Sequence, residues 1–240
     1  MVRPSTDGSG LVHVRLRDDS TLPDVDELRG WLDSIAALEV RPKTIRSAAL
    51  LPRAAERFEA AGFEVADRLV LLRVSLDDPL VRSAIAGTDD AMTRTMRRYH
   101  QGAASTVDRA AFGPGWGHDA AELTEICRAT PAHAARYRPA WPRHRGIPRR
   151  QQLVAFAIAG ASSERGYLQR LAVDPGAQRA GHGRALTVDA LRWMARRRVA
   201  DCLVNTSVDN HAALALYRSI GFTPMDDLLT VLHADVGALR

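Results

Sequence analysis

The stretch YLQRLAVDPGAQRAGHGRALTVDALRW, residues 167–193, decides the fold of this chain. Tyr167 to Val173 has the composition of a strand, Asp174-Pro175 turns the chain, and residues 183–198 carry apolar side chains at helical spacing. Glycines at 181 and 183 let successive backbone N–H groups point into one concavity. The following helix adds the positive end of its dipole, so the stretch predicts a strand, loop and helix that can hold a pyrophosphate.

A glycine pair before a helix is also typical of an ordinary tight strand-to-helix turn. The hypothesis of a pyrophosphate-binding loop therefore needs support from the surrounding sequence. That support lies downstream, in NHAALALYRSIGF, residues 210–222. This stretch, together with QRAGHG at residues 178–183, resembles the GNAT acetyltransferases. In that family the cofactor loop is written Q/R-x-x-G-x-G/A, and a later helix bears N-x-x-A-x-x-x-Y-x-x-x-G-F. The resemblance extends from about Thr93 to the C-terminus.

The resemblance implies acetyl-CoA as cosubstrate and a mixed α/β (α+β), mostly antiparallel sheet flanked by helices. It implies that backbone groups of three strand residues, Leu171, Ala172 and Val173, pair with the pantetheine arm. It also implies that six loop amides hold the pyrophosphate, those of Arg179, Ala180, Gly181, His182, Gly183 and Arg184. Asn210 is then expected near the thioester, and Tyr217 as the proton donor to the departing thiolate. A phenol with pKa near ~10 suits that role, although Tyr217 also fits a core position beside Leu214 and Ile220.

The general base stays open. Ribosomal-protein alanine acetyltransferases, which this chain resembles in its C-terminal part, carry a glutamate where Asn205 stands here, and asparagine cannot take a proton. The strand Tyr167 to Val173 carries no carboxylate either. The alternatives are a histidine acting through water, bulk water, or one of three acids: Glu122, Glu125 and Asp209. We expect His182 and His211 to face solvent or cofactor phosphate.

The N-terminal part repeats elements of the C-terminal part. RAAERFEAAGFEVADRLVLLRV, from Arg53, matches HAALALYRSIGFTPMDDLLTVLHA, from His211, but Phe58 stands in place of Tyr217 and Leu51 in place of Asn210. The repeat is far longer than a solenoid period and suggests two related domains or a domain and a half. We therefore predict a degenerate, partial GNAT-like domain at residues 1–76, with a structural role in packing, in shaping the acceptor entrance or in forming a homodimer.

The pattern of apolar residues predicts alternating strands and helices. In the N-terminal part it predicts strands at 11–16, 44–50 and 68–74 and helices at 24–40 and 52–61. Residues 77–92 are predicted to be a linker, and residues 93–240 the catalytic domain. There we expect strands at 93–99, 153–161, 167–173, 201–206 and 228–233 and helices at 103–112, 119–130, 183–198 and 210–219.

Composition places the chain among soluble globular proteins, because 46% of its 240 residues are hydrophobic. Apolar runs such as Leu153 to Ala161 are far shorter than the ~20 residues that a membrane helix needs. The N-terminal MVRPSTDGSG lacks the apolar core of a signal peptide, so we expect cytoplasmic residence and no membrane partner. Cys127 and Cys202 have neither disulfide nor zinc spacing, which predicts buried or neutral thiols and no metal.

The net charge of +5 permits nucleic-acid binding, but Lys43 is the only lysine, so the excess of arginine indicates a compositional bias. The densest basic segment, Arg136 to Arg150, is predicted to be an exposed loop. Our leading hypothesis is an N-acetyltransferase that acetylates a primary amine, either a protein N-terminus or a small molecule. The alternative is a catalytically weak acetyl-CoA sensor or interaction module, and an arginine-rich nucleic-acid binder ranks third.

Overall fold

The structure, a computed structural model, describes residues 2–4, 11–14, 16, 22–36, 44–87, 92–140 and 153–235. The chain divides into two compact units. Unit 1 comprises Met1–Leu71, Asn205–Asn210 and Met225–Arg240, and unit 2 comprises Leu72–Val204 and His211–Pro224. The strands β4 (Glu64–Ser75), β9 (Asp201–Ser207) and β10 (Thr223–Asp235) contribute residues to both units.

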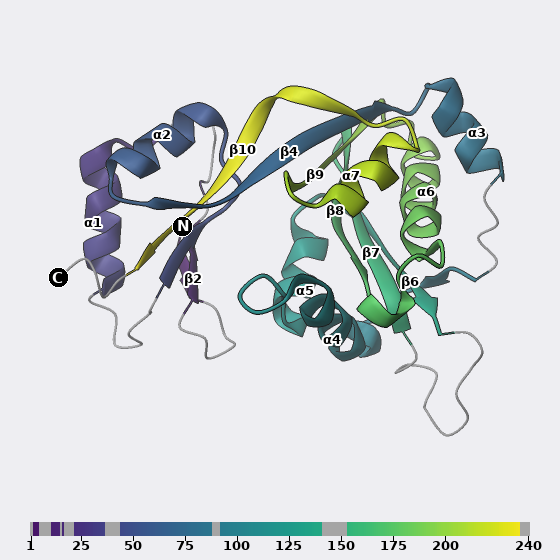
Figure 1. Ribbon diagram of the computed structural model, residues 1–240, viewed down its shortest axis with the longest axis horizontal. Helices are drawn as coiled ribbons and strands as arrows, with labels where there is room; N and C mark the ends of the chain where they lie inside the picture. The colour runs from purple at the N-terminus through teal and green to yellow at the C-terminus, as the bar shows by residue number, and fades with distance from the viewer. Residues whose placement is uncertain are drawn as a thin grey trace. The chain divides into compact units, whose positions relative to one another are not determined.

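Unit 1 packs two helices on a small mixed sheet (Figure 1). Its other elements are β1 (Val2–Pro4), β2 (Leu11–Val14), α1 (Val25–Ala36), β3 (Thr44–Ser47) and α2 (Pro52–Ala60). β2 runs parallel to β3, while β1 pairs with β2 and β10 with β3 in antiparallel fashion. Leu28 of α1 and Phe58 of α2 are buried against Ile45 of β3, which explains why these short elements hold together.

Unit 2 is built on a larger sheet with helices on both faces. Its elements are α3 (Pro79–Gly87), β5 (Arg94–Thr95), α4 (Gln101–Phe112), α5 (Ala120–Arg128), β6 (Ala132–Pro139), β7 (Leu153–Ala161), β8 (Arg165–Val173), α6 (His182–Ala195), β9 (Asp201–Ser207) and α7 (His211–Arg218). The strands follow the order β9-β8-β7-β6-β5, with antiparallel pairs from β5 to β8 and a parallel pair between β8 and β9. The predicted mixed, mostly antiparallel sheet is confirmed.

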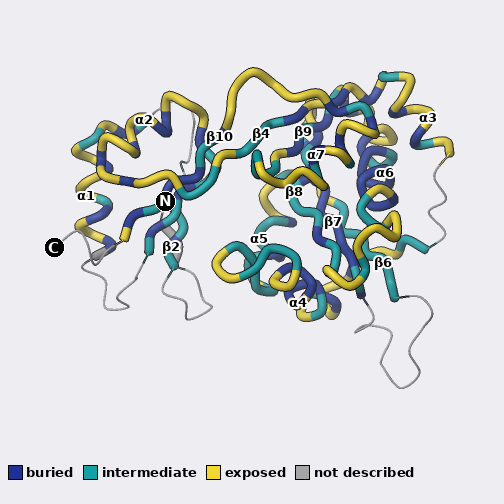
Figure 2. Tube along the Cα trace, viewed as in Figure 1, coloured by how far each residue is buried: buried dark blue, intermediate teal, exposed yellow. Residues whose placement is uncertain are grey.

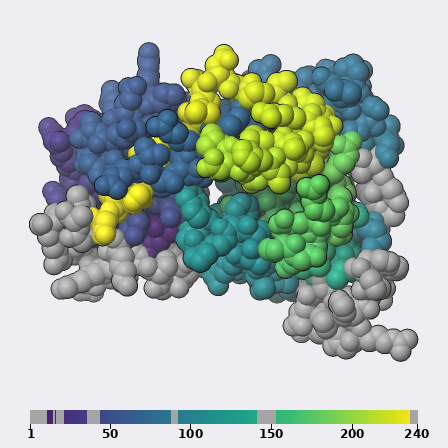
Figure 3. Space-filling model, viewed as in Figure 1, coloured from purple at the N-terminus to yellow at the C-terminus, as the bar shows by residue number. Residues whose placement is uncertain are grey.

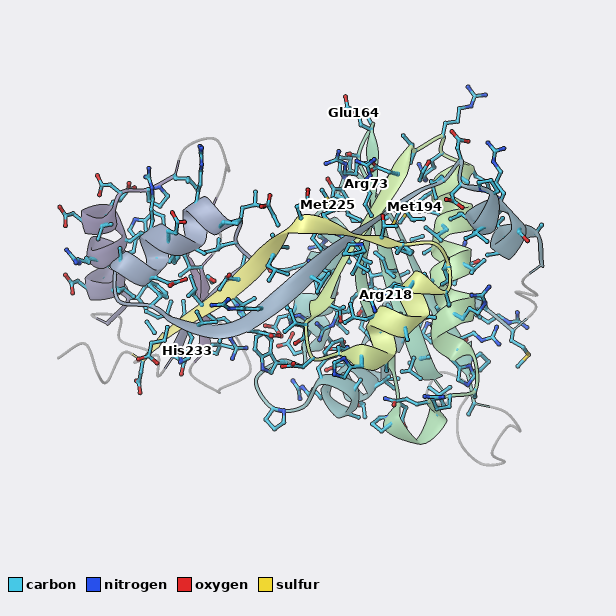
Figure 4. All side chains as sticks on the ribbon, turned by 45° about the horizontal axis from the view of Figure 1, so that its top comes forward. Arg73, Glu164, Met194, Arg218, Met225 and His233 are labelled. Carbon is cyan, nitrogen blue, oxygen red and sulfur yellow. The ribbon has the colours of Figure 1, made fainter. Side chains whose placement is uncertain are left out.

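The two faces of this sheet have different partners. Phe156 and Ala172 of the sheet are buried with Val107 of α4 and Leu123 of α5. Met194 of α6 (Figure 4) packs on Gly166 of β8, where a Cβ atom would collide with the methionine sulfur. β7 lies between these layers and is almost wholly buried (Figure 2), which accounts for the continuous apolar run in its sequence.

Most predicted elements are present with shifted ends, but three segments differ. The strand expected at 93–99 is reduced to Arg94–Thr95, because a 3₁₀ turn follows at Arg98–His100 in which the Arg97 amide donates to His100 Nδ1 at 2.9 Å. Residues 77–92, predicted to be a linker, include helix α3, which buries Val81 and Ala84. The predicted boundaries of the domains remain predictions.

The third difference concerns the basic segment 136–150. Its first residues belong to β6, so the prediction of an exposed loop is wrong over Arg136–Pro139. Arg136 is opposite Ala157 of β7 and places its Nε 3.2 Å from Asp189 of α6, a pairing that single-sequence patterns do not reveal. Residues 141–150 lie outside the described residues.

Candidate active site

Strand β8 offers backbone groups along its second half. It pairs with β7 along its length, whereas its pairing with β9 covers only Arg165–Tyr167 of β8 in the described strands. A register shift also leaves Gln169 without a partner on β7, since Leu168 pairs with Ala159 and Arg170 with Ile158. This β-bulge twists the strand, and the side of residues 169–173 that faces away from β7 can accept an extended ligand as an added strand.

The loop after β8 presents backbone amides to solvent. Arg179 and Gly181 have positive φ angles of 64° and 80°, and Gly181 is the N-cap of α6. The first hydrogen bond of α6 runs from the Ala185 amide to the Gly181 carbonyl at 3.0 Å. No amide of residues 179–184 donates a hydrogen bond to another described residue. Such a run of amides at a helix start is a typical anion-binding arrangement.

Gly183 brings the predicted site residues together. A Cβ atom on Gly183 would lie 3.2 Å from Leu216 Cδ2, 3.8 Å from Val173 Cγ2 and 4.0 Å from Leu171 Cδ2. The absence of a side chain therefore lets the first turn of α6 approach both the end of β8 and helix α7. Leu216 immediately precedes Tyr217, so the structure unites the predicted strand, loop and tyrosine helix in unit 2.

This region is open to solvent. Arg179, Ala180 and Gly181 are exposed, and atoms of this loop and of α7 both reach the surface on the face that Figure 3 shows. Arg184 is exposed as well, and its Nη1 lies 3.4 Å from Ser219 Oγ at the end of α7.

His182 has a partner on β6. Arg138 Nε donates to His182 Nδ1 at 3.5 Å. Burial lowers the pKa of His182 below its ordinary value, and the charge of Arg138 lowers it further. The ring is therefore neutral at pH 7 and carries its proton on Nε2, which suits a hydrogen-bond donor better than a base.

Tyr217 is 4% exposed and its ring centroid lies 5.5 Å from that of Phe222. Burial raises the pKa of Tyr217, with a further contribution from Cys202, so the phenol keeps its proton at neutral pH. A proton donor needs that form. Burial also raises the pKa of Cys202 to about 12 and raises the pKa of Cys127. Both cysteines are free and buried, which confirms the prediction of neutral thiols.

Four predicted residues on β9 and at the start of α7 are exposed. Asn210 precedes α7 and its amide donates to the Ser207 carbonyl at 3.0 Å. Asn205 on β9, Asp209 and His211 are also exposed. Asn210 thus directly precedes the helix that carries Tyr217, and the role of Asn210 stays a prediction.

Sequence reasoning missed a buried ion pair between α4 and β8. Asp108 is 0% exposed, and Arg170 donates to it from Nε at 2.8 Å and from Nη2 at 2.6 Å. Arg170 Nη2 also donates to the Trp116 carbonyl at 2.8 Å, and the guanidinium lies 3.5 Å from the centroid of the Phe112 ring. An acid on the apolar side of α4, next to Val107, was the available signal, since such an acid is rarely buried without a partner.

The turn between α4 and α5 carries a histidine and a carboxylate in contact. Asp119 and Glu122 form a capping box at the start of α5, in which each side chain accepts the other residue's amide at 2.8 Å. His118 Nδ1 lies 3.5 Å from Glu122 Oε2. Their side chains are 21% and 20% exposed, so solvent screens the pair only partly.

Residues 109–222 match the sequence pattern of the Acetyltransferase (GNAT) family. They form a GNAT acetyltransferase domain. The matched range includes β8, the amide loop and the tyrosine helix, which are the parts that meet at Gly183. None of the described residues forms a group of three or more His, Cys, Asp or Glu side chains that could hold a metal ion. No described helix has the length and apolar character needed to cross a membrane.

Two curated relatives are similar to part of the chain. A mycothiol acetyltransferase from a Nocardioides species is 40% identical over 73 residues, which is 30% of this chain and 25% of that protein. The [ribosomal protein bS18]-alanine N-acetyltransferase of Escherichia coli is 39% identical over 71 residues, which is 30% of this chain and 48% of that protein. The chain thus matches less than half the length of either relative.

The fold of the whole chain is similar to that of a tandem GNAT protein from the clavulanic acid biosynthesis pathway. The two share 16% sequence identity with a TM-score of 0.62, over 96% of this chain and 77% of the other. The likeness in fold therefore extends beyond the matched domain to unit 1.

Proposed function

We propose that this chain transfers an acetyl group from acetyl-CoA to a primary amine. The observation that carries the proposal is the close approach at Gly183, where β8, the amide loop and the helix of Tyr217 meet. Each of these parts offers what one portion of the cosubstrate needs. The strand offers hydrogen-bonding groups, the loop offers donors for phosphate, and the helix offers a protonated phenol.

In the proposed mechanism the pantetheine arm pairs with Leu171–Val173 as an added strand, and the amides of residues 179–184 hold the pyrophosphate. The neutral amine attacks the thioester carbonyl directly. A strand amide near Ala172 or Val173 stabilises the oxyanion, and Tyr217 protonates the departing thiolate. Asn210 holds the cosubstrate near its thioester end.

The acceptor is proposed to be a protein N-terminus or a small-molecule amine. The similarity to a ribosomal-protein alanine acetyltransferase supports the first, and the similarity to a mycothiol acetyltransferase supports the second. We further propose that the N-terminal part has a structural role and binds no acetyl-CoA. Cytoplasmic residence and homodimer formation stay predictions.

Calorimetric titration of acetyl-CoA tests the proposal. We expect the wild type to bind, and Gly181→Asp and Gly183→Asp to lose binding. Gly181 has a positive φ at the loop, and a side chain on Gly183 would force α6 away from Leu216 and the end of β8. Gly102→Asp is the matched control, since Gly102 is exposed at the start of α4 and a Cβ there meets nothing within 4 Å. A wild type without binding would reject an acetyltransferase.

Detection of free CoA in the presence of an amine and peptide panel then distinguishes the enzyme from an acetyl-CoA sensor. Asn205, in place of a carboxylate, is the observation that favours a sensor. Binding with acyl transfer supports the enzyme, whereas binding without transfer to any acceptor supports the sensor.

A further inference from the structure

The proposed reaction needs a proton acceptor, because an amine that forms an amide must lose a proton. This inference rests on the proposed function. Asn205 cannot take the proton, and Asp209 is an exposed acid. A base held in place beside β8 would serve the reaction better, since proton transfer requires a positioned group.

The turn between α4 and α5 holds such a group. Glu122 is fixed by the capping box with Asp119, and its Oε2 lies 3.5 Å from His118 Nδ1. A carboxylate beside Nδ1 favours the tautomer with its proton on that nitrogen, so Nε2 keeps a lone pair. Enzymes that activate a nucleophile often use a histidine as base, with a carboxylate that contacts and orients its other ring nitrogen.

Hydrogen bonds connect the same turn, through Asp108, to the strand that we propose to bind the thioester. The His118 amide donates to Asp108 Oδ2 at 2.7 Å, and Asp108 is held by two bonds from Arg170 of β8. Ser105 of α4 donates to the His118 carbonyl at 3.0 Å. His118 is therefore positioned through its backbone, and its ring remains available for chemistry.

We propose that His118, oriented by Glu122, is the catalytic base of the acetyl transfer. The amine nitrogen forms a bond to the carbonyl carbon and the bond from that carbon to sulfur breaks. The proton of the amine passes to His118 Nε2, directly or through one water molecule, while the thiolate takes a proton from Tyr217. The products are the acetylated amine and free CoA, and solvent exchange restores both side chains.

The charges around this ring come from three elements. α4 contributes Asp108, the start of α5 contributes Asp119 as N-cap and Glu122, and β8 contributes Arg170. Asp108 and Arg170 neutralise each other at 2.6 Å, so Glu122 is the charged group that contacts the imidazole.

The first experiment compares His118→Ala with the wild type, using acetyl-CoA and a peptide that begins with alanine. The variant keeps the backbone bond to Asp108. We expect its transfer rate at pH 7 to fall by about 10²- to 10⁴-fold, the usual contribution of a general base, with unchanged acetyl-CoA affinity. Added imidazole should restore part of the rate, which a merely structural role of His118 would not allow.

His133→Ala is the matched control, since His133 is an exposed histidine on β6 and should keep the wild-type rate. Full activity of His118→Ala at pH 7, or no rescue by imidazole, would overturn the proposal while acetyl transfer itself stands.

The second experiment needs no turnover, so it separates this inference from the proposed function. In protein with ¹⁵N-labelled histidine, the His118 signals are assigned by their loss in His118→Ala. We expect the wild type at high pH to carry the proton on Nδ1, and Glu122→Gln to shift the population toward Nε2. A wild-type ring with its proton on Nε2 would overturn the proposal, whatever the activity.

Discussion

The segments α2–β4 and α7–β10 share one backbone design and differ in chemistry. Each consists of a helix, a glycine, a phenylalanine and a long strand. Each helix ends with the same bond, in which the phenylalanine amide donates to the carbonyl five residues earlier. The distance from the amide nitrogen to the carbonyl oxygen is 3.1 Å for Phe63 and Phe58, and also 3.1 Å for Phe222 and Tyr217. This bond belongs to the Schellman motif, which needs a residue with positive φ.

The side chains repeat as well. The glycines have φ angles of 99° at Gly62 and 110° at Gly221. The aromatic ring on the helix contacts the following phenylalanine in both segments, with centroids 5.0 Å apart in the first and 5.5 Å apart in the second. The repeat that the sequence suggested is thus present as repeated contacts.

The difference lies in a single hydroxyl and in the neighbouring elements. Phe58 is buried in an apolar core, whereas Tyr217 lies next to Leu216, which contacts Gly183 of the amide loop. The helix–glycine–phenylalanine unit is therefore a way to end a helix and start a strand. The adjoining strand and loop, together with one phenol, provide the proposed chemistry.

Truncation of the shared phenylalanine should have the largest effect on stability. We expect Phe63→Ala and Phe222→Ala each to lose about 3–5 kcal/mol, since both side chains are buried and leave cavities. Hydrogen exchange should report the loss in unit 1 for Phe63→Ala and in unit 2 for Phe222→Ala. Equal effects in both units for either variant would contradict the comparison.

Removal of the hydroxyl from the second copy should affect turnover rather than folding. Tyr217→Phe is expected to lower the transfer rate by about 10²-fold or more, because the thiolate loses its proton donor. Calorimetry should show unchanged acetyl-CoA binding, and urea unfolding a nearly unchanged free energy. Wild-type turnover in this variant would remove Tyr217 from the mechanism.

The reverse change in the first copy should give no activity. Phe58 is 1% exposed, so Phe58→Tyr buries a hydroxyl and is expected to cost about 1–3 kcal/mol of unfolding free energy. Calorimetry on the variant should still give one acetyl-CoA per chain. Two equivalents, in the variant or in the wild type, would show that the first copy retains a binding site.

The glycines offer a smaller test. Gly62→Ala and Gly221→Ala should each destabilise by about 1–2 kcal/mol, because a Cβ disfavours positive φ. At Gly221 the added Cβ would have its nearest contacts at 3.7 Å, and at Gly62 none within 4 Å, so clashes do not explain the loss. Matched losses in chemical unfolding would confirm that both glycines serve the same backbone purpose.

Buried groups at and beside the second copy should also make the stability depend on alkaline pH. The pKa of Cys202 is raised to about 12 in the folded protein, and that of Tyr217 is raised as well. Both groups lose their protons more readily in the unfolded chain than in the folded protein. The free energy of unfolding is therefore unaffected by these groups below about pH 9 and decreases as the pH rises above that value, by about 1 kcal/mol per pH unit for Cys202. Cys202→Ala should reduce this fall in urea unfolding, whereas Phe58→Tyr should add to it.

Short-range pattern in the sequence determined much of the fold. The strand at residues 167–173, the glycine loop and the helices around residues 190 and 214 appear where predicted, because hydrophobic period, glycine and proline act locally. The strand Ala132–Pro139 was missed. Its position depends on pairing with β7, and its arginines are not typical of a strand.

The sequence by itself determined the motif, the proposed loop and the tyrosine, since their residue types and spacing carry the information. Only the tertiary structure decided which distant residues meet. It placed Gly183 against Leu216, joined Asp108 to Arg170 across 62 positions, and set His118 beside Glu122 on a turn fastened to β8. Burial and side-chain pairing depend on the whole packed sheet, and a linear pattern contains no record of which surfaces come into contact.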